Sequence, residues 1–437
     1  MHVTRLVLDH FRSWTHCLID FEPGVTVLYG RNGLGKTNIV EAIEFLSTGA
    51  SHRASASAPL VERGQRTATI RANVASGGGD GADVADADVA DADGDDGAAN
   101  AEGDGTNHDS AADVTTYTVT IPLRGGNRAR INSEASVYLR DIVGRVRTVT
   151  FAPDDQLLVS MDPARRRGFL DSAGAQLVPG YYEALQGFTH VARQRAQIFR
   201  QIAQDRAVGR DISPLLAGLD AWTGGFMDAG IRLTRMRARV CAALQDEFAS
   251  IYADLADDGT HATMRYAPNF AEALPLLAVD GTAQALGSDD ADEAPDEAAA
   301  MDAVRRGISG HFQRIYEGEV AQGRNLIGPH RDDIVFELDG APARDYASNG
   351  EMWTIALALR MALFRVLDRM PGGSPILILD DVFSQLDATR RARIVDFAAS
   401  CDQAIITVAA PGDVPEGIDA RLVDVAAVKE ESDASPW

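Results

Sequence analysis

A short stretch near the start of the chain has the residue types and the spacing of a loop that binds phosphate. It follows the pattern G-x-x-x-x-G-K-[ST] and consists of Gly30, Arg31, Asn32, Gly33, Leu34, Gly35, Lys36 and Thr37, with Asn38 next in the chain. Glycines let the backbone curl until successive N–H groups point at phosphate oxygens. In this pattern the lysine reaches the β- and γ-phosphates, and the threonine hydroxyl helps to hold Mg²⁺. We therefore predict that this stretch binds a nucleoside triphosphate, with Lys36 as a catalytic residue and Thr37 as a metal ligand.

The elements on either side of the loop support this prediction. Residues 25–29 are β-rich, and residues 38–46 repeat apolar side chains at helical spacing. A strand, a glycine loop and a helix in this order place the anion at the N-terminus of the helix, where backbone N–H groups attract negative charge. A glycine turn without a ligand is the alternative, and the flanking elements disfavour it.

A pair of aspartates far along the chain is expected to complete the site. Residues 376–379 form an unbroken aliphatic run, which is typical of a strand buried on both faces of a parallel sheet. Carboxylates at the C-terminal end of such a strand face the ligand crevice. We predict that Asp380 holds Mg²⁺, directly or through water, and that Asp381 orients and polarises the attacking water. The alternative is a pair of solvated turn aspartates.

A second helix start carries two interpretations. Ser348, Asn349, Gly350 and Glu351 precede a strongly periodic helix that stops at Pro371-Gly372-Gly373. The S-x-x-E spacing is a capping box, and taken alone it favours an ordinary helix cap. The functional alternative is that this N-terminus binds the γ-phosphate of a nucleotide held by a second subunit.

Charge and composition limit the class of protein. The chain of 437 residues carries a net charge of −23, but two tracts without Lys or Arg hold twelve acidic residues (76–113) and eight (280–302). The remainder is therefore close to neutral, at −3, and a basic DNA-facing surface is compatible with it. Three scattered cysteines and the lack of an apolar signal or membrane-length run predict a soluble intracellular protein without disulfides or a zinc site.

The periodicity divides the chain into three parts. Residues 1–155 are rich in strands, 156–322 are mostly helical, and 323–437 return to an α/β pattern. The acidic tract 76–113 is predicted to be a disordered insertion in a hairpin, with an acidic regulatory segment as the alternative. The second tract, 280–302, is predicted to be a linker, and the helical pattern over 215–252 is expected to break at Gly224-Gly225.

One polar motif and several arginine clusters have no assigned role at this point. The segment 328–333, Gly-Pro-His-Arg-Asp-Asp, is either a turn ahead of a strand or part of a site. Arginines at helical spacing could face DNA phosphates, although such residues are more often solvated or paired. These arginines are Arg165, Arg166, Arg167, Arg193, Arg195, Arg232, Arg235, Arg237 and Arg239.

The order of these motifs resembles that of the ATP-binding-cassette (ABC) ATPases, in which two heads sandwich two nucleotides. Lys36 and Ser348 lie 312 positions apart, and a long insertion at this point resembles the SMC-type DNA-repair branch. Within that branch the chain is similar to the RecF family in segments that span it from end to end. These segments are 6–12, 30–46, 51–53, 151–155, 165–171, 328–333 and 380–387.

The resemblance implies an α/β fold, an ABC-type P-loop ATPase head of mixed sheet and flanking helices with an inserted, mostly α-helical second domain. The cofactors would be ATP and Mg²⁺. Ser348–Glu351 would form the signature that binds the partner's ATP, and Ser384 and Asp387 would lie at the dimer interface. Gln385 departs from the family pattern there, as do Met352 and Trp353 after the signature.

Two further departures concern catalysis. The histidine that usually follows the strand at 404–407 is absent, and Thr407 is expected in its place. Asp381 stands where the family pattern has a glutamate. Both departures predict slow hydrolysis, with ATP acting as a dimerisation switch.

A RecF-like protein would be cytoplasmic and would bind DNA at single-strand gaps and junctions with duplex. It would dimerise on ATP and, with RecO and RecR, load RecA in gap repair and the SOS response. A transport-type cassette ATPase and a structural head of a larger DNA-organising complex remain alternatives. The long gap before the signature argues against the first, and the lack of long coiled-coil arms argues against the second.

Overall fold

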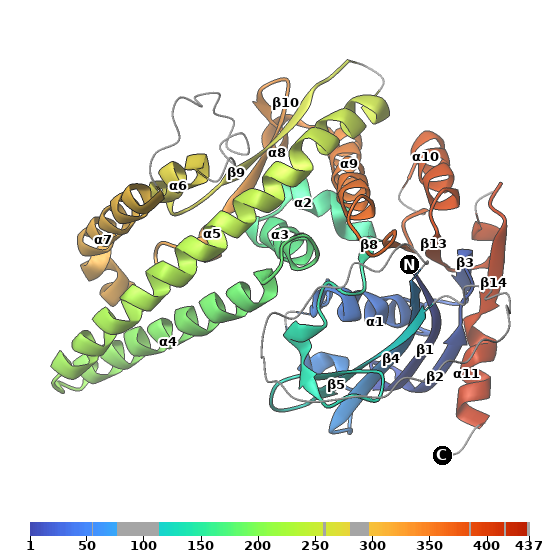
Figure 1. The fold of residues 1–437 in the computed structure, drawn as a ribbon, viewed down its shortest axis with the longest axis horizontal. Helices are drawn as coiled ribbons and strands as arrows, with labels where there is room; N and C mark the ends of the chain where they lie inside the picture. The colour runs from blue at the N-terminus through green and yellow to red at the C-terminus, as the bar shows by residue number, and fades with distance from the viewer. Residues whose placement is uncertain are drawn as a thin grey trace, which may run out of the picture.

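The computed structural model describes residues 1–54, 56–76, 113–256, 259–279, 297–383, 386–414 and 417–434. Two sheets and the helices around them form one part of the molecule, and long helices with a small third sheet form the other (Figure 1). Two large hydrophobic clusters fill these parts. Among the described residues, no helix is both long enough and apolar enough to cross a bilayer.

The first sheet is antiparallel and holds the N-terminal strands. Its order is β2-β1-β4-β5-β6-β7. The strands are β1 (His2–Phe11), β2 (Trp14–Asp20), β4 (Thr67–Ser76), β5 (Asp113–Pro122), β6 (Arg128–Ile131) and β7 (Val137–Tyr138). Alternate residues of β1 and β4 are buried, and they share a core with the apolar side chains of α1 (Lys36–Thr48). One face of the sheet therefore packs on α1, and the other face is left to solvent.

The second sheet is parallel and carries the predicted nucleotide site. Its order is β14-β3-β13-β12-β8. The strands are β3 (Gly24–Tyr29), β8 (Thr148–Phe151), β12 (Ile376–Asp380), β13 (Gln403–Val408) and β14 (Ala420–Asp424). Every residue of β12 and β13 is buried, which confirms the strand predicted from the aliphatic run. Because β3 and β12 both pair with β13, the loop after β3 and the aspartates after β12 meet at one edge.

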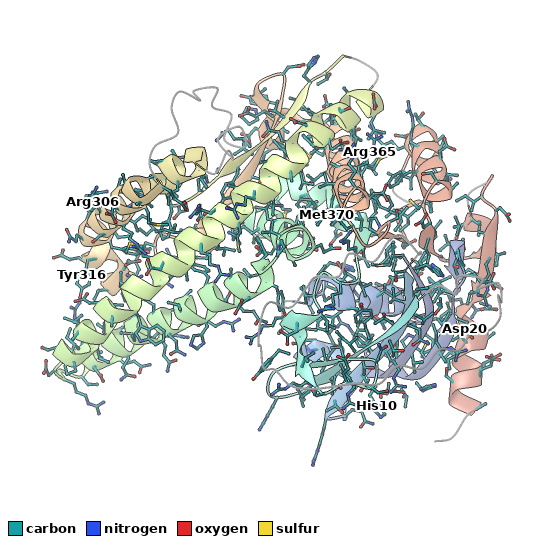
Figure 2. All side chains as sticks on the ribbon, viewed as in Figure 1. His10, Asp20, Arg306, Tyr316, Arg365 and Met370 are labelled. Atoms are coloured by element: carbon teal, nitrogen blue, oxygen red, sulfur yellow. The ribbon has the colours of Figure 1, made fainter. Side chains whose placement is uncertain are left out.

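Helices make up most of the middle of the chain. They are α2 (Leu157–Ser160), α3 (Pro163–Leu177), α4 (Tyr181–Ala207), α5 (Ser213–Ala256), α6 (Leu274–Val279), α7 (Glu297–Gln322), α8 (Ala343–Tyr346) and α9 (Asn349–Asp368). α10 (Ala388–Ala399) and α11 (Val425–Ala434) follow near the C-terminus. In Figure 1, α4 and α5 run side by side away from the sheets. Arg365 of α9 lies beside α5, where it forms an ion pair with Glu247 at 3.6 Å (Figure 2).

The predicted break at Gly224-Gly225 is wrong, because α5 runs through both residues as one helix of 44 residues. Two glycines cost a helix about 2 kcal/mol relative to alanine. Packing of the apolar face offsets that cost, since Leu219 and Phe226 on either side are fully buried.

A third, small sheet crosses a predicted boundary. β9 (Ala262–Ala267) pairs with β10 (Asp333–Leu338), which in turn pairs with β11 (Ala341–Pro342). The α/β pattern after residue 322 was expected to return to the ATPase head, but its first strands belong with the helical segment. The boundary at 322/323 stays a prediction.

Both acidic tracts lie mainly outside the described residues. The hairpin prediction for the first is confirmed, since β4 and β5 pair from Thr67↔Pro122 to Ser76↔Asp113. Ser76 and Asp113 thus belong to strands, and the predicted disorder concerns residues 77–112, which are not described. The second tract ends earlier than predicted, because α7 already begins at Glu297.

Candidate nucleotide-binding site

The phosphate-loop pattern forms the predicted turn between β3 and α1. Gly30, Gly33 and Gly35 have φ values of 150°, 89° and 102°, in the region that favours glycine. A Cβ on Gly35 would lie 2.6 Å from Nε1 of Trp14, the atom that donates to the Gly35 carbonyl at 3.1 Å. Backbone conformation and a close neighbour therefore both require glycine at position 35.

The loop closes around the ammonium group of Lys36. Its Nζ donates to the carbonyl of Gly30 at 2.5 Å and to that of Arg31 at 3.2 Å, and it lies 3.4 Å from Oδ1 of Asn32. Burial lowers the pKa of Lys36, and the charges of Asp381 and Asp380 act in the opposite direction. The cation is thus held inside the loop, beside the two aspartates.

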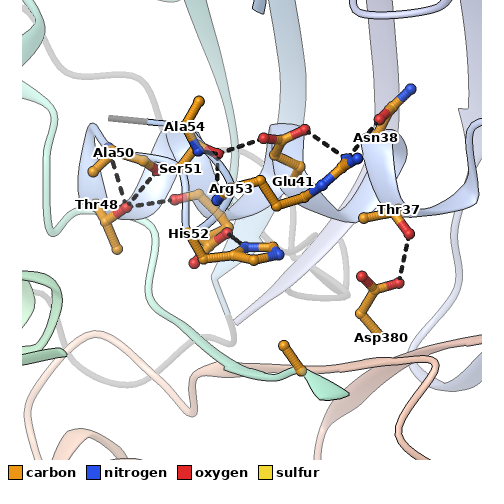
Figure 3. A network of polar contacts seen from close by, with 12 residues as sticks. Thr37, Asn38, Glu41, Thr48, Ala50, Ser51, His52, Arg53, Ala54 and Asp380 are labelled. Carbon is orange, nitrogen blue, oxygen red and sulfur yellow. Dashed lines mark hydrogen bonds and ion pairs between the residues drawn. The ribbon is translucent and has the colours of Figure 1, made fainter. Parts of the chain in front are cut away.

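The two predicted metal ligands touch each other. Thr37 Oγ1 donates to Oδ1 of Asp380 at 3.1 Å, although the residues are 343 positions apart (Figure 3). A hydroxyl and a carboxylate oxygen are ligands that Mg²⁺ accepts, and Mg²⁺ commonly takes few protein ligands beside phosphate and water. The donor set therefore fits the predicted ion.

Thr407 on β13 holds Asp380 from the other side. Its hydroxyl donates to the same Oδ1 at 2.7 Å and accepts the N–H of Asp381 at 3.0 Å. Thr407 is fully buried. Its hydroxyl is thus committed to two protein groups, and its expected place in the position of a switch histidine stays a prediction.

Asp381 leaves the strand in an unusual backbone conformation. Its φ is 51°, which is uncommon for a residue with a side chain. Burial raises the pKa of Asp381, the charge of Asp380 raises it further, and Lys36 lowers it. The carboxyl therefore lies close to both the lysine and the second aspartate, as its predicted role requires.

A network of ion pairs and hydrogen bonds that holds α1 in place next to the phosphate loop was not predicted from the sequence. The carboxylate of Glu41 is fully buried and accepts from Arg12 at 2.9 and 2.5 Å and from Arg53 at 3.3 Å. Arg53 also donates to the side chain of Asn38 at 2.9 Å (Figure 3). The position of Glu41 within α1 gives no sign of this role, since its partners come from the turn after β1 and from the segment after α1.

His52 belongs to the same region. Its Nδ1 lies 2.5 Å from Oε2 of Glu44. Burial opposes a charge on this imidazole, but the hydrogen bond to Glu44 and the carboxylates of Glu44, Asp380 and Glu41 outweigh it and raise the pKa of His52. The segment 51–53 therefore supports α1 and adds positive charge near the site.

The Ser348 segment forms the predicted capping box at the start of α9. Ser348 Oγ accepts the N–H of Glu351 at 3.3 Å, and Glu351 Oε2 accepts the N–H of Ser348 at 2.7 Å. Among the described residues, no hydrogen bond or ion pair joins Ser348–Glu351 to the phosphate loop. The signature role therefore stays a prediction.

Arg390 of α10 supports this helix start. Its guanidinium donates to the carbonyl of Gly350 at 3.0 Å and to Thr354 Oγ1 at 3.1 Å. Asp387 caps α10 by accepting the N–H of Arg390 at 2.9 Å, and it pairs with the Arg390 side chain. The predicted interface residue Ser384 lies outside the described residues, as does Gln385.

The motif at 328–333 pairs with two of the arginines that had no assigned role. Arg166 forms a bidentate ion pair with Asp333 at 2.5 and 3.1 Å. Arg237 of α5 bonds to Asp332 and Asp171 at 2.9 Å each. Asp332 is fully buried, and Arg166 and Arg237 are 3% and 2% exposed. These ion pairs therefore hold α3, α5 and β10 together, and a site role for residues 328–333 stays a hypothesis.

Three of the arginines suggested for DNA are therefore inside the protein. Arg166 and Arg237 have the partners just described, and Arg195 pairs with buried Glu319 at 2.6 Å. The hypothesis that they face phosphates is wrong, because a buried, paired guanidinium is not available to a ligand.

The comparisons with known proteins agree with this geometry. The family model "RecF/RecN/SMC N terminal domain" matches residues 2–431. "DNA replication and repair protein RecF" of Bifidobacterium longum subsp. infantis is 50% identical over 430 residues, covering 98% of this chain and 90% of that protein. The same protein of Bifidobacterium adolescentis is 47% identical over 434 residues, covering 99% and 93%.

This chain belongs to the RecF family.

Solved structures agree with the RecF assignment. The structure of "the recombination mediator protein RecF-ATPrS in RecFOR pathway" matches with a TM-score of 0.72 and 21% identity, covering 97% of this chain and 96% of that one. The corresponding RecF-ATP structure matches with a TM-score of 0.70. The fold is thus that of RecF, an ABC-type ATPase head, as the order of motifs predicted.

Proposed function

We propose that this RecF-family chain is an ATP-dependent, DNA-binding recombination mediator of DNA replication and repair. The observation that carries the proposal is the contact of Thr37 with Asp380 beside the phosphate loop. This contact brings together the phosphate loop and the strand end that would form an ATP site. The relatives at 50% and 47% identity are named DNA replication and repair proteins.

The loop Gly30–Asn38 would hold the phosphates of ATP, and Thr37 and Asp380 would hold Mg²⁺. The bound ion would neutralise phosphate charge. Lys36 would leave the loop carbonyls for the β- and γ-phosphates, and Asp381 would orient the attacking water. Aspartate is shorter than glutamate and would hold the attacking water less closely, so the proposed hydrolysis is slow. Its stimulation by DNA is part of the same proposal.

ATP would act as a switch between monomer and homodimer. Ser348–Glu351 of one chain would bind the γ-phosphate held by its partner, because a helix N-terminus attracts anions. The capping box occupies the N–H groups of Ser348 and Glu351. The N–H groups of Asn349 and Gly350, at the first turn of α9, have no partner within the helix and would face the phosphate. Asp387, and Ser384 outside the described residues, would lie at the same interface.

The cellular setting follows from the family. The dimer would bind single-strand gaps and junctions with duplex in the cytoplasm. With RecO and RecR it would load RecA, supporting gap repair and the SOS response. The names of the two similar solved structures place those proteins in the RecFOR pathway. RecO and RecR are proposed as partners of this chain on that basis.

The molar mass measured by light scattering with and without ATP·Mg²⁺ and gapped DNA tests the proposal. We expect the molar mass of a monomer without nucleotide and that of a dimer with ATP·Mg²⁺. With gapped DNA added, we expect the molar mass of a dimer bound to the DNA. A wild-type chain that binds ATP and stays monomeric with DNA present would contradict it.

A further inference from the structure

The solvent face of the first sheet carries a groove of about 500 Å³ that is lined by arginines and hydroxyl groups. Its residues come from β4, β5, β6 and the turn after β6, with no Asp or Glu among them. They are Thr69, Arg71, Thr116, Thr118, Thr120, Arg128, Ala129, Arg130, Asn132, Ser133 and Ser136. The groove is thus strongly basic in a protein whose net charge is −23.

Strand register places the arginines in a fixed pattern. Arg71, Thr118 and Arg130 are direct neighbours across β4, β5 and β6. Neighbouring strands are about 4.8 Å apart, so the backbones of Arg71 and Arg130 lie about 10 Å apart. Arg128 lies two residues from Arg130 on the same strand and the same face, about 7 Å away. The cations are therefore spread along the groove on a rigid sheet.

Within the part of the chain that the structure describes, these arginines differ from Arg5 of the same sheet in having no acidic partner. Arg5, on the same face, pairs with Asp20 at 2.5 Å. Arg71, Arg128 and Arg130 are exposed, and no carboxylate among the described residues forms an ion pair with them. Three like charges lining one groove repel each other, and an anionic ligand relieves that repulsion.

An exposed tyrosine positions one of them. The guanidinium of Arg128 lies 4.4 Å from the centre of the Tyr138 ring, and that of Arg140 lies 4.6 Å from the same ring. Stacking limits the freedom of Arg128 without neutralising it. Its charge therefore stays available to a ligand at the edge of the groove.

We propose that this groove binds the phosphodiester backbone of DNA without reading its sequence. Arginine, threonine, serine and asparagine side chains are the groups that contact DNA phosphates. A protein partner would need apolar or aromatic anchors at the centre of the interface, and Ala129, the only apolar residue of the lining, is buried. The inference rests on the proposed function, since it places the DNA of that function on the first sheet.

The test is the salt dependence of binding to a labelled duplex with a single-stranded tail, at saturating ATP·Mg²⁺. The variant combines Arg71→Gln, Arg128→Gln and Arg130→Gln. A plot of the logarithm of the association constant against log[salt] has a negative slope, and each lost phosphate contact reduces its magnitude by about 0.9. We therefore expect the magnitude of the slope to be smaller by about two to three in the variant. A slope difference of this size changes the affinity ratio of the two proteins by about 15- to 60-fold between 200 and 50 mM salt, so we also expect more than about tenfold weaker binding at 50 mM salt. ATP-driven dimerisation is expected to stay unchanged.

A control variant with the same change in charge combines substitutions to Gln on exposed helical arginines outside the groove: Arg200, Arg206 and Arg314. We expect it to keep the wild-type slope. An equal loss in both variants, or no change in the groove variant, would overturn the inference. Binding of polyglutamate through the same arginines, with unchanged DNA binding, would also overturn it and indicate an acidic protein partner. If the wild type binds no DNA, the proposed function fails instead.

Discussion

Thr407 Oγ1 lies 2.7 Å from Oδ1 of Asp380, across the neighbouring strands β13 and β12. The same aspartate oxygen also accepts from Thr37 at 3.1 Å. Because Thr407 is buried and its hydroxyl also receives the N–H of Asp381, it fixes both aspartates relative to the phosphate loop. Thr407, at the position where the family pattern has a histidine, is therefore a positioning residue for Asp380, the proposed metal ligand.

Replacing Thr407 with valine removes the hydroxyl and keeps the shape of the side chain. Groups that hold a metal ligand in place typically contribute 10- to 100-fold to metal affinity or activity. We predict that Thr407→Val raises the Mg²⁺ concentration needed for half-maximal ATP hydrolysis by about tenfold. Thr407→Ser keeps the hydroxyl and is expected to resemble the wild type. An unchanged Mg²⁺ dependence in the valine variant would show that Asp380 needs no such support.

Arg390 links α10 to the first turn of α9. Its removal takes two hydrogen bonds from the Gly350 carbonyl and Thr354. We predict that Arg390→Ala weakens ATP-dependent dimerisation by roughly tenfold, because a charged hydrogen bond contributes about 1.5 kcal/mol. Binding of ATP to the monomer, measured by calorimetry, is expected to stay the same. Arg393→Ala on the same helix serves as the control, and equal loss in both variants would contradict the prediction.

A substitution of Asp332 tests the structural role of the Gly328–Asp333 motif. Its carboxylate accepts from Arg237 at 2.9 Å, from the N–H of Asn269 at 2.8 Å and from the hydroxyl of Tyr266. We predict that Asp332→Asn lowers the free energy of unfolding by about 3 kcal/mol, because the positive charge of the buried Arg237 loses one of its two carboxylate partners. Urea unfolding measures the change. The exposed Asp302→Asn is expected to change stability by less than about 0.5 kcal/mol.

His330 of the same motif makes stability depend on pH. Burial lowers its pKa to about 4, and its Nδ1 is buried without a hydrogen-bond partner among the described residues. In the unfolded chain the pKa of this histidine is about 6.5. Between pH 6.5 and pH 4 the imidazole is therefore protonated in the unfolded chain and neutral in the folded chain. This contribution to stability is present above pH 6.5 and is lost as the pH falls towards 4. We predict that the free energy of unfolding falls by about 2 kcal/mol more in the wild type than in His330→Asn between pH 7 and pH 5. Equal pH dependence in the two proteins would contradict this.

Local patterns predicted the elements of the nucleotide site because their signals are short-range. The glycine spacing at 30–35, the helix start at Ser348 and the aliphatic run before Asp380 each depend on neighbours in the chain. The register that brings Asp380 to Thr37 could be expected only from the general rule that the C-terminal ends of parallel strands share one edge.

What the sequence could not predict depends on partners far apart in the chain. A single Glu41 gives no sign that Arg12 and Arg53 will meet it, and Arg166 and Arg237 look like surface arginines until Asp333 and Asp332 are placed beside them. The groove on the first sheet was missed for the same reason, since Arg71 and Arg130 come together only through the register of three strands. The continuous α5 shows that packing can outweigh the local preference of Gly224-Gly225.

The central claim is that Lys36 of one chain and Ser348 of another complete one ATP site. The most direct test mixes two variants, Lys36→Ala and Ser348→Arg, each expected to stay monomeric alone with ATP·Mg²⁺. In a mixed dimer, one site has both native residues and the other has both substitutions. We predict that the equimolar mixture forms dimers by light scattering while neither variant does alone. A mixture that stays monomeric, or a Ser348→Arg variant that dimerises unaided, would contradict a site shared between two chains.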